Sequence, residues 1–285
     1  MPELCILHAN CQGEVLEKLL LFHPDFAARF TVRHVVNYTR EPIEQETLDH
    51  TSLYLYQYLG PHFQEYASSV FLDRLPASCH SLCIPNLFFK GYWPFWTNST
   101  QVIDFANTVL EDLFRRNLDP ELLLSIYLKG KLPEFEKVCA IANDSLAREK
   151  EKERLQPIQY THILEEHWRD EALFYTVNHP GIRLSCHVAQ EVLRLLGFSP
   201  LPEAVLASFV HPFGDFCLPI HPEVGKRLNL RFTGIDVTYP IYGSRFTHRD
   251  FVINYLACRL HGVSNLPAFL HASSEKKHGL AVLSE

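Results

Sequence analysis

The residues best suited to chemistry lie near the start of the chain, where Cys11 follows a short apolar segment. Residues 4–9 are apolar apart from His8, and the polar turn Asn10-Cys11-Gln12-Gly13 separates them from the helix-forming residues 14–21. This order predicts a strand, a tight turn and a helix. The free N–H groups and positive dipole end of a helix favour the thiolate form of a cysteine at such a turn. The turn therefore suits a cysteine nucleophile, whereas the alternative interpretation is a small apolar plug at a strand end.

A nucleophilic cysteine needs a base within hydrogen-bond reach, and His179 is our candidate. It follows the strand-like residues 173–178 and precedes Pro180 and Gly181, which would hold its ring on a rigid loop. The chain contains 16 histidines, so an ordinary loop histidine is the competing interpretation. Only pairing with Cys11 favours the catalytic role.

Two sets of N–H groups could stabilise a developing oxyanion. The first is the pair of backbone N–H groups of Gln12 and Gly13, and the second is the side-chain amide of Asn86, which follows the apolar residues 82–84. Asn86 also begins an aromatic segment around Lys90 that could hold a cofactor or a sugar. A packed aromatic loop with Asn86 as a turn residue explains this segment equally well.

Length and composition indicate a globular protein that we treat as a single α/β domain over residues 1–285. With 285 residues, of which 47% are hydrophobic, the chain can bury a substantial core. A net charge of −7 without a basic stripe argues against nucleic-acid binding. The N-terminal segment resembles neither a signal peptide nor a membrane span, and the eight scattered cysteines fit reduced thiols. We therefore expect a cytoplasmic protein.

The hydrophobic pattern predicts strands first and a helical region later. Strands are expected at residues 30–38, 52–59 and 81–86. Together with the first strand–turn–helix unit, they predict a parallel sheet. Helical patterns are expected at residues 100–117, from 120 onward, 145–154, 160–168 and 186–196. We interpret roughly residues 100–170 as a helical insertion, followed by a loop-rich C-terminal region that ends in one helix around residues 251–260.

Signals for metal or nucleotide binding are weak. Cys79, His80 and Cys83 lack a second pair of ligands at zinc-finger spacing, and His162 with Glu166 lacks the HExxH context. The sequence contains neither a Walker A motif nor GxGxxG. We therefore expect no metal site and no phosphate-binding loop.

Several segments, in their order and spacing, resemble the WcbI family of polysaccharide-biosynthesis proteins over most of the chain. They are Asn10-Cys11-Gln12-Gly13, Ile84-Pro85-Asn86 with Gly91-Tyr92-Trp93-Pro94, residues 145–149 and residues 173–180. That family is similar in layout to the SGNH hydrolases and acetyltransferases, with a cysteine in place of their first-block serine. Its namesake is assigned as a capsule O-acetyltransferase that binds coenzyme A.

The resemblance implies an SGNH-like three-layer core built on a parallel sheet. It also implies that the protein transfers an acyl group, expected to be acetyl, from coenzyme A to a sugar hydroxyl of capsular or other surface polysaccharide. It implies that Cys11 is the nucleophile, His179 the base and Asn86 an oxyanion donor. The residues expected to bind acyl-CoA are Gln12, Gly13, Lys90 and Tyr92. The alternatives are a thiol esterase or deacetylase of glycans and a non-catalytic component of a polysaccharide assembly complex. A homo-oligomer is compatible with all three.

One position departs from the SGNH pattern. SGNH enzymes place an aspartate three residues before the histidine, whereas this chain has Thr176 there. Asp170 or Glu171 could orient His179 only if the fold returns one of them to its ring. The other arrangement is a dyad without an acid.

Overall fold

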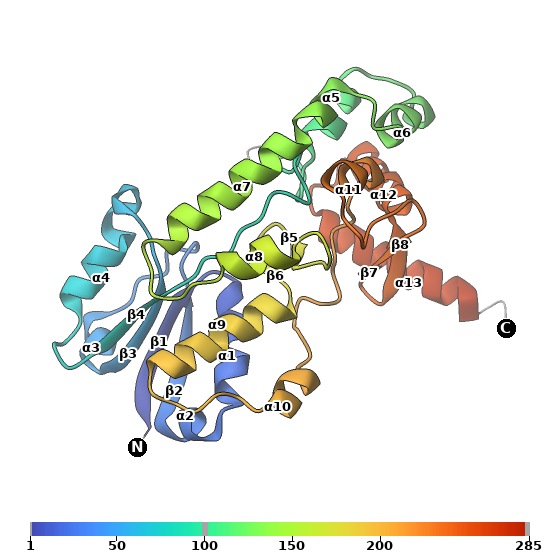
Figure 1. The fold of residues 1–285 in the computed structure, drawn as a ribbon. Coiled ribbons are helices and arrows are strands. Elements are labelled where there is room, and N and C mark those ends of the chain that lie inside the picture. The colour runs from blue at the N-terminus through green and yellow to red at the C-terminus, as the bar shows by residue number, and fades with distance from the viewer. Residues whose placement is uncertain (1, 99–101, 283–285) are drawn as a thin grey trace. The chain divides into compact units, whose positions relative to one another are not determined.

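The computed structural model describes residues 2–98 and 102–282, which form two compact units (Figure 1). The first unit contains the chain up to residue 88 and residues 148–164 and 178–212. The second contains residues 89–147, 165–177 and the chain from residue 213 onward. The sequence analysis treats the chain as a single domain with a helical insertion over roughly residues 100–170. In the structure, residues 148–164 of that stretch belong to the first unit and its other described residues to the second.

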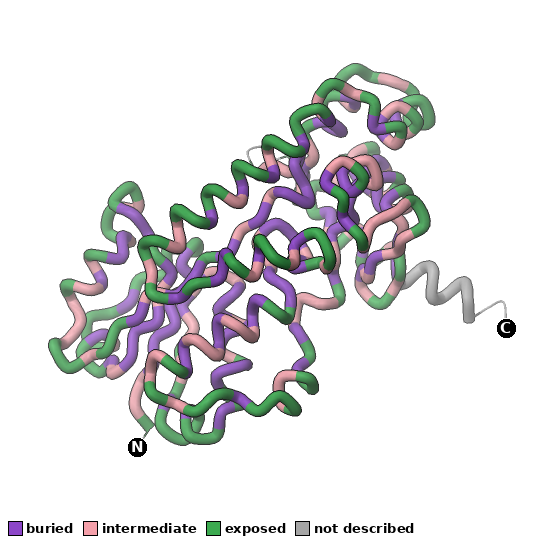
Figure 2. The backbone as a smooth tube through the Cα atoms, viewed as in Figure 1, coloured by how far each residue is buried: buried purple, intermediate pink, exposed green. Residues whose placement is uncertain are grey.

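The first unit is built on a four-stranded parallel sheet, as the sequence pattern predicts. The strands lie in the order β2-β1-β3-β4, and every neighbouring pair is parallel. Their bounds are Glu3–Ala9 for β1, Phe30–Val36 for β2, Thr51–Gln57 for β3 and His80–Ile84 for β4. The central strand β1 is buried from Cys5 to Ala9 (Figure 2). Burial on both faces explains why this strand reads as a nearly continuous apolar run.

Helices cover both faces of this sheet (Figure 1). On one face, α1 (Gln12–Leu21) packs against α2 (Pro24–Arg29) and α9 (Ile182–Leu195). On the other, α3 (Gln45–Asp49) contacts α4 (Ser68–Arg74), whose Phe71 packs with Ile6 and Tyr54 of the sheet. Alternation of side chains along each strand supplies apolar residues to both layers. The unit also contains η1 (Pro61–Tyr66), β6 (His179–Pro180) and α10 (Glu203–Ser208).

Asn10 and Gly13 fix the turn between β1 and α1. The side-chain oxygen of Asn10 accepts a hydrogen bond from the Gln12 N–H at 2.9 Å, and its carbonyl accepts one from the Gly13 N–H at 2.9 Å. Gly13 also leaves room for His34, whose Nε2 lies 3.2 Å from the carbonyl oxygens of both Ala9 and Asn10. A Cβ at position 13 would lie 2.3 Å from that nitrogen. Cys11 is thereby held at the carboxyl end of the central strand, the edge where open α/β sheets bind ligands.

The second unit is mainly helical. Its elements are α5 (Thr108–Arg115), α6 (Pro120–Leu128), η2 (Pro133–Lys137), β5 (Phe174–Thr176), α11 (Pro222–Leu228), β7 (Thr238–Ile241), β8 (Ser244–Thr247), α12 (His248–Leu260) and α13 (Leu266–Val282). Two further helices, α7 (Val138–Glu153) and α8 (Thr161–His167), contribute residues to both units. No helix among the described residues is long and apolar enough to cross a membrane.

Two helix predictions in this unit need correction. The helix expected over residues 100–117 begins at Thr108; residues 100 and 101, where the prediction starts, lie outside the described part of the chain. The expectation of one closing helix is wrong, because α13 follows α12. Pro267 suggests a loop in the sequence, but it is the second residue of α13, where proline is compatible with a helix.

Replacing Gly13 with alanine should lower the free energy of unfolding by about 1–3 kcal/mol, because the added methyl group must displace the His34 ring from its two carbonyl partners. Urea unfolding measures the change. Gly234→Ala is the control, since its Cβ would lie 3.4 Å from the nearest atom, on Val237. The explanation fails if Gly13→Ala is as stable as the wild type, or if the loss is undiminished in a His34→Ala background.

Candidate active site

The structure brings Cys11 and His179 together in the first unit. Nε2 of His179 lies 3.2 Å from Sγ of Cys11, although the two residues are 168 positions apart in the sequence. Cys11 precedes the first residue of α1, and His179 lies three residues before the start of α9, the helix that packs against α1. This arrangement provides a thiol and a base within hydrogen-bond distance.

Asn178 adds a donor that the sequence analysis missed. Its side-chain Nδ2 lies 3.7 Å from the sulfur of Cys11, within hydrogen-bond distance for a sulfur acceptor. A sulfur or oxygen that gains negative charge at this place would be stabilised by such a donor. The available signal was its position directly before the predicted base.

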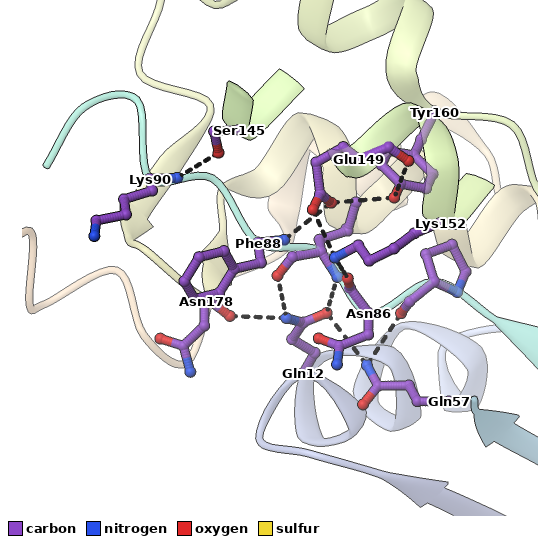
Figure 3. A network of polar contacts seen from close by, with 12 residues as sticks. Gln12, Gln57, Asn86, Phe88, Lys90, Ser145, Glu149, Lys152, Tyr160 and Asn178 are labelled. Atoms are coloured by element: carbon purple, nitrogen blue, oxygen red, sulfur yellow. Dashed lines mark hydrogen bonds and ion pairs between the residues drawn. The ribbon is translucent and has the colours of Figure 1, made fainter. Parts of the chain in front are cut away.

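Gln12 connects the turn to two other segments (Figure 3). Its Nε2 donates to the carbonyl oxygens of Leu87 at 2.7 Å and Asn178 at 2.8 Å. Its Oε1 accepts from the Leu87 N–H at 3.1 Å and from Gln57 Nε2 at 3.3 Å. The residue is only 7% exposed. Both donor hydrogens and the acceptor of this side chain are already used by the protein, and the role of Gln12 in cofactor binding stays a prediction.

Asn86 lies next to the same turn. Its Oδ1 accepts a hydrogen bond from Asn10 Nδ2 at 3.2 Å. Its carbonyl accepts one from Lys152 (Figure 3). These contacts fix the loop after β4 to the end of β1. The role of Asn86 as an oxyanion donor stays a prediction.

A buried carboxylate, Glu149, supports the loop that carries Asn86. It is 1% exposed, accepts from the Phe88 N–H at 3.1 Å and from the Tyr160 hydroxyl at 3.1 Å, and pairs with Lys152 at 2.6 Å (Figure 3). Burial raises the pKa of Glu149, while Lys152 and the hydrogen bonds oppose this shift. Residues 145–154 carry many charges of both signs, and Glu149 among them fixes a loop next to the site instead of facing solvent.

The protonation states of the pair differ from the sequence expectation. Burial raises the pKa of Cys11 to about 11, although the N–H groups of Cys11 and Gln12 act in the opposite direction. Burial also lowers the pKa of His179 to about 4, and Glu14 only partly counteracts this. The prediction of a helix-stabilised thiolate is wrong, because desolvation outweighs the donors at the helix end. At neutral pH the pair consists of a thiol and a neutral imidazole, which can act as a general base.

A second buried histidine lies near the base. His211 Nε2 is 3.3 Å from Ser185 Oγ, which in turn donates to the Pro180 carbonyl at 3.4 Å. Burial lowers the pKa of His211 to about 4, and the proximity of His179 lowers it further. These contacts restrain the residue that directly follows His179. No sequence pattern distinguishes His211 from the other histidines of the chain.

The proposed backbone oxyanion donors have partners within the turn. The Gly13 N–H donates to the Asn10 carbonyl, and the Gln12 N–H donates to the Asn10 side chain as well as facing the Cys11 sulfur. The ring of His34 explains why residue 13 is a glycine, because a Cβ there would collide with the ring. Of the two donors, only the Gln12 N–H also faces the reactive sulfur.

The remaining predicted ligand-binding residues belong to the second unit. Tyr92 has no exposed surface, and its hydroxyl donates to the Trp168 carbonyl at 2.6 Å. The side chain of Tyr92 is therefore engaged within the protein, and its role in cofactor binding stays a prediction. Lys90 is half-buried, its backbone N–H donates to Ser145 Oγ at 2.8 Å, and its role in binding stays a prediction.

The two acids considered as partners of His179 also lie in the second unit. Asp170 pairs with Arg231 at 3.1 Å, and Glu171 lies 3.8 Å from His167. Each therefore has a partner of its own. Among the described carboxylates, Glu14 is the one that acts electrostatically on His179 and raises its pKa.

Comparison with known proteins gives two matches. Residues 4–201 match the family described as "Polysaccharide biosynthesis enzyme WcbI". A solved structure of WcbI, described as the native protein without a disulfide bond between coenzyme A and one of its cysteines, superimposes with a TM-score of 0.72 at 17% identity. The match covers 95% of this chain and 93% of that one, so the fold is shared over nearly the whole length. No curated protein matches by sequence.

The raised pKa of Cys11 predicts no thiolate at neutral pH. The difference in thiolate ultraviolet absorbance between wild type and Cys11→Ser should stay flat from about pH 5 to 9 and rise only on approach to pH 11. Subtracting the variant removes the contributions of the other seven cysteines. A step in the difference at or below pH 7 would show a thiolate–imidazolium pair and contradict the neutral state.

Proposed function

Because the chain belongs to the WcbI family of polysaccharide biosynthesis enzymes, we propose that it is an acyltransferase. It moves an acyl group, expected to be acetyl, from coenzyme A to a sugar hydroxyl of capsular or other surface polysaccharide. The observation that carries the proposal is the 3.2 Å contact between Cys11 Sγ and His179 Nε2. The mention of coenzyme A in the description of the solved WcbI structure supports the choice of donor.

In the first half-reaction, the Cys11 sulfur attacks the thioester carbonyl carbon of acetyl-CoA while His179 Nε2 accepts the thiol proton. This step requires the tautomer of His179 that carries its proton on Nδ1. The tetrahedral intermediate collapses by breaking the bond to the coenzyme A sulfur, which takes the proton from His179. The products are acetyl-Cys11, free coenzyme A and a neutral imidazole. One thioester replaces another, so the acetyl group stays activated.

In the second half-reaction, His179 removes the proton of a sugar hydroxyl, and the oxygen attacks the carbonyl carbon of acetyl-Cys11. The bond to the Cys11 sulfur breaks, and the sulfur recovers its proton from His179. Asn178, the Gln12 N–H and Asn86 are the candidate donors to the two oxyanions. The imidazole is neutral at pH 7, so Nε2 can accept the proton in both steps, although its lowered pKa of about 4 makes it a weaker base than an ordinary histidine.

The groups at Cys11 suit reaction with a thioester carbonyl: the thiol can attack it, the His179 imidazole can accept the thiol proton, and the Asn178 amide can donate to the oxyanion. Lys90 is our prediction for the phosphates of coenzyme A. We place the reaction in the cytoplasm, because the mechanism needs Cys11 as a free thiol and a reducing compartment preserves it. All eight cysteines are free in the structure.

Incubation with acetyl-CoA should place one acetyl group on Cys11, detected by intact-protein and peptide mass spectrometry. The Cys11→Ala variant should carry no adduct and lose acyl transfer, and His179→Ala should acetylate about 10²–10⁴-fold more slowly, because it lacks the general base. Full activity of Cys11→Ala without an adduct would reject the covalent route. Equal turnover of an acyl ester in the absence of coenzyme A would favour the glycan esterase instead.

Coenzyme A should raise the apparent melting temperature, since a ligand that binds only the folded state stabilises it by about 2.7 kcal/mol at a hundred times its dissociation constant. Thermal-shift titration measures the effect, with pantetheine as the control that lacks the nucleotide. Lys90→Ala should weaken the response to coenzyme A but leave that to pantetheine unchanged. No shift at millimolar coenzyme A would count against this donor.

A further inference from the structure

One side chain connects the two chain segments that carry Cys11 and His179. Gln12 directly follows Cys11, and its Nε2 donates to the carbonyl of Asn178, the residue directly before His179, at 2.8 Å. The distance between sulfur and imidazole therefore depends on backbone positions that this one amide connects. Gln12 also holds both polar backbone groups of Leu87 (Figure 3).

The hydrogen-bonding capacity of this amide matches its surroundings. A primary amide has two donor hydrogens and an acceptor oxygen with two lone pairs. Gln12 uses both hydrogens on carbonyl oxygens and both lone pairs on N–H groups, of Leu87 and Gln57. A glutamate would turn a carboxylate oxygen toward two carbonyl oxygens, and an asparagine is one methylene shorter. Few other side chains could make these contacts.

Gln57 extends the connection to the sheet. Its Nε2 donates to the Pro85 carbonyl at 3.0 Å, and its Oε1 accepts from the Asn10 N–H at 2.8 Å. Gln57 is the last residue of β3, the strand paired with β1, and is 1% exposed. The two glutamines therefore tie the turn at Cys11 to the sheet edge, to the loop after β4 and to the segment carrying His179.

We propose that the side chain of Gln12 has a positioning role: its amide keeps His179 at hydrogen-bond distance from Cys11 without itself touching the substrate, whereas the backbone N–H of Gln12 stays a candidate oxyanion donor. This inference rests on the proposed roles of Cys11 and His179. Loss of the Gln12 amide leaves the carbonyls of the buried Leu87 and the partly buried Asn178 without this donor, and the backbone before His179 moves to find another. A displacement of about 1 Å is enough to cost a reacting pair much of its efficiency.

The test measures the reactivity of Cys11 without any acyl donor. Gln12→Met keeps the length and burial of the side chain but removes its hydrogen bonds. The alkylation rate of Cys11 by iodoacetamide at neutral pH, followed by peptide mass spectrometry, should fall about tenfold or more, as expected when a thiol loses its general base. The exposed Cys139 should react unchanged in the same samples. Gln12→Asn, which retains the amide on a shorter stem, serves if Gln12→Met does not fold.

Gln190→Met is the matched control. Gln190 clamps a backbone in the same way, since its Nε2 donates to the Leu201 carbonyl at 3.0 Å and its Oε1 accepts from the Leu201 N–H at 2.8 Å. It lies in the first unit but does not bond to either segment of the reactive pair. The variant should lose stability without changing the alkylation rate of Cys11. An equal fall in both variants would mean that Gln12 acts only through stability.

A double-mutant cycle with His179→Ala decides whether Gln12 acts through the base. The inference predicts that Gln12→Met lowers the alkylation rate in the wild-type background and leaves it unchanged in the His179→Ala background. The same fold-change in both backgrounds would overturn it. Coupling without acetylation of Cys11 by acetyl-CoA would leave Gln12 a positioning residue and reject the proposed acyl transfer, so the two failures are distinguishable.

Discussion

The contact between the Cys11 sulfur and the His179 imidazole spans 168 residues of sequence, and it constrains much of the first unit. A parallel sheet places the end of β1 at the edge where β3 and β4 also end. The packing of α1 against α9 brings their two N-terminal ends together. Amide side chains then join the loops at this edge, because each loop exposes backbone groups that need partners once water is excluded.

The same exclusion of water determines the protonation of the pair. The helix end and the N–H groups favour a thiolate, but burial favours neutral forms of both side chains and is the larger effect. A neutral pair avoids the free-energy cost of desolvating charged groups when a substrate covers it. Its reactivity then depends on proton transfer during attack, which makes the distance between Sγ and Nε2 more important than a preformed charge.

Local patterns identified the parts of the fold that depend on local sequence. The apolar run of β1 and the turn residues Asn10 and Gly13 specify elements in the predicted place. The helix expected from residue 120 onward is α6, which Asp119 caps by accepting from the Glu121 and Leu122 N–H groups. The helix α13 was missed, although Pro267 at its second position is compatible with the first turn of a helix. The division into two units could not be predicted, because residues 148–164 belong to the first unit, where Glu149 accepts a hydrogen bond from the Phe88 N–H across 61 positions of sequence.

The candidate pair was predictable from residue type and family resemblance, whereas its environment was not. Burial of Cys11, saturation of Gln12 and the full burial of Tyr92 depend on packing between distant segments. The central claim is that Cys11 carries the acyl group between donor and acceptor. Rapid-quench analysis of a single turnover with isotopically labelled acetyl-CoA and a sugar acceptor tests it most directly. The account predicts label on Cys11 that forms first and decays at the rate at which acetylated sugar appears. Acetylated sugar that forms without a lag, while Cys11 stays unlabelled, would contradict it.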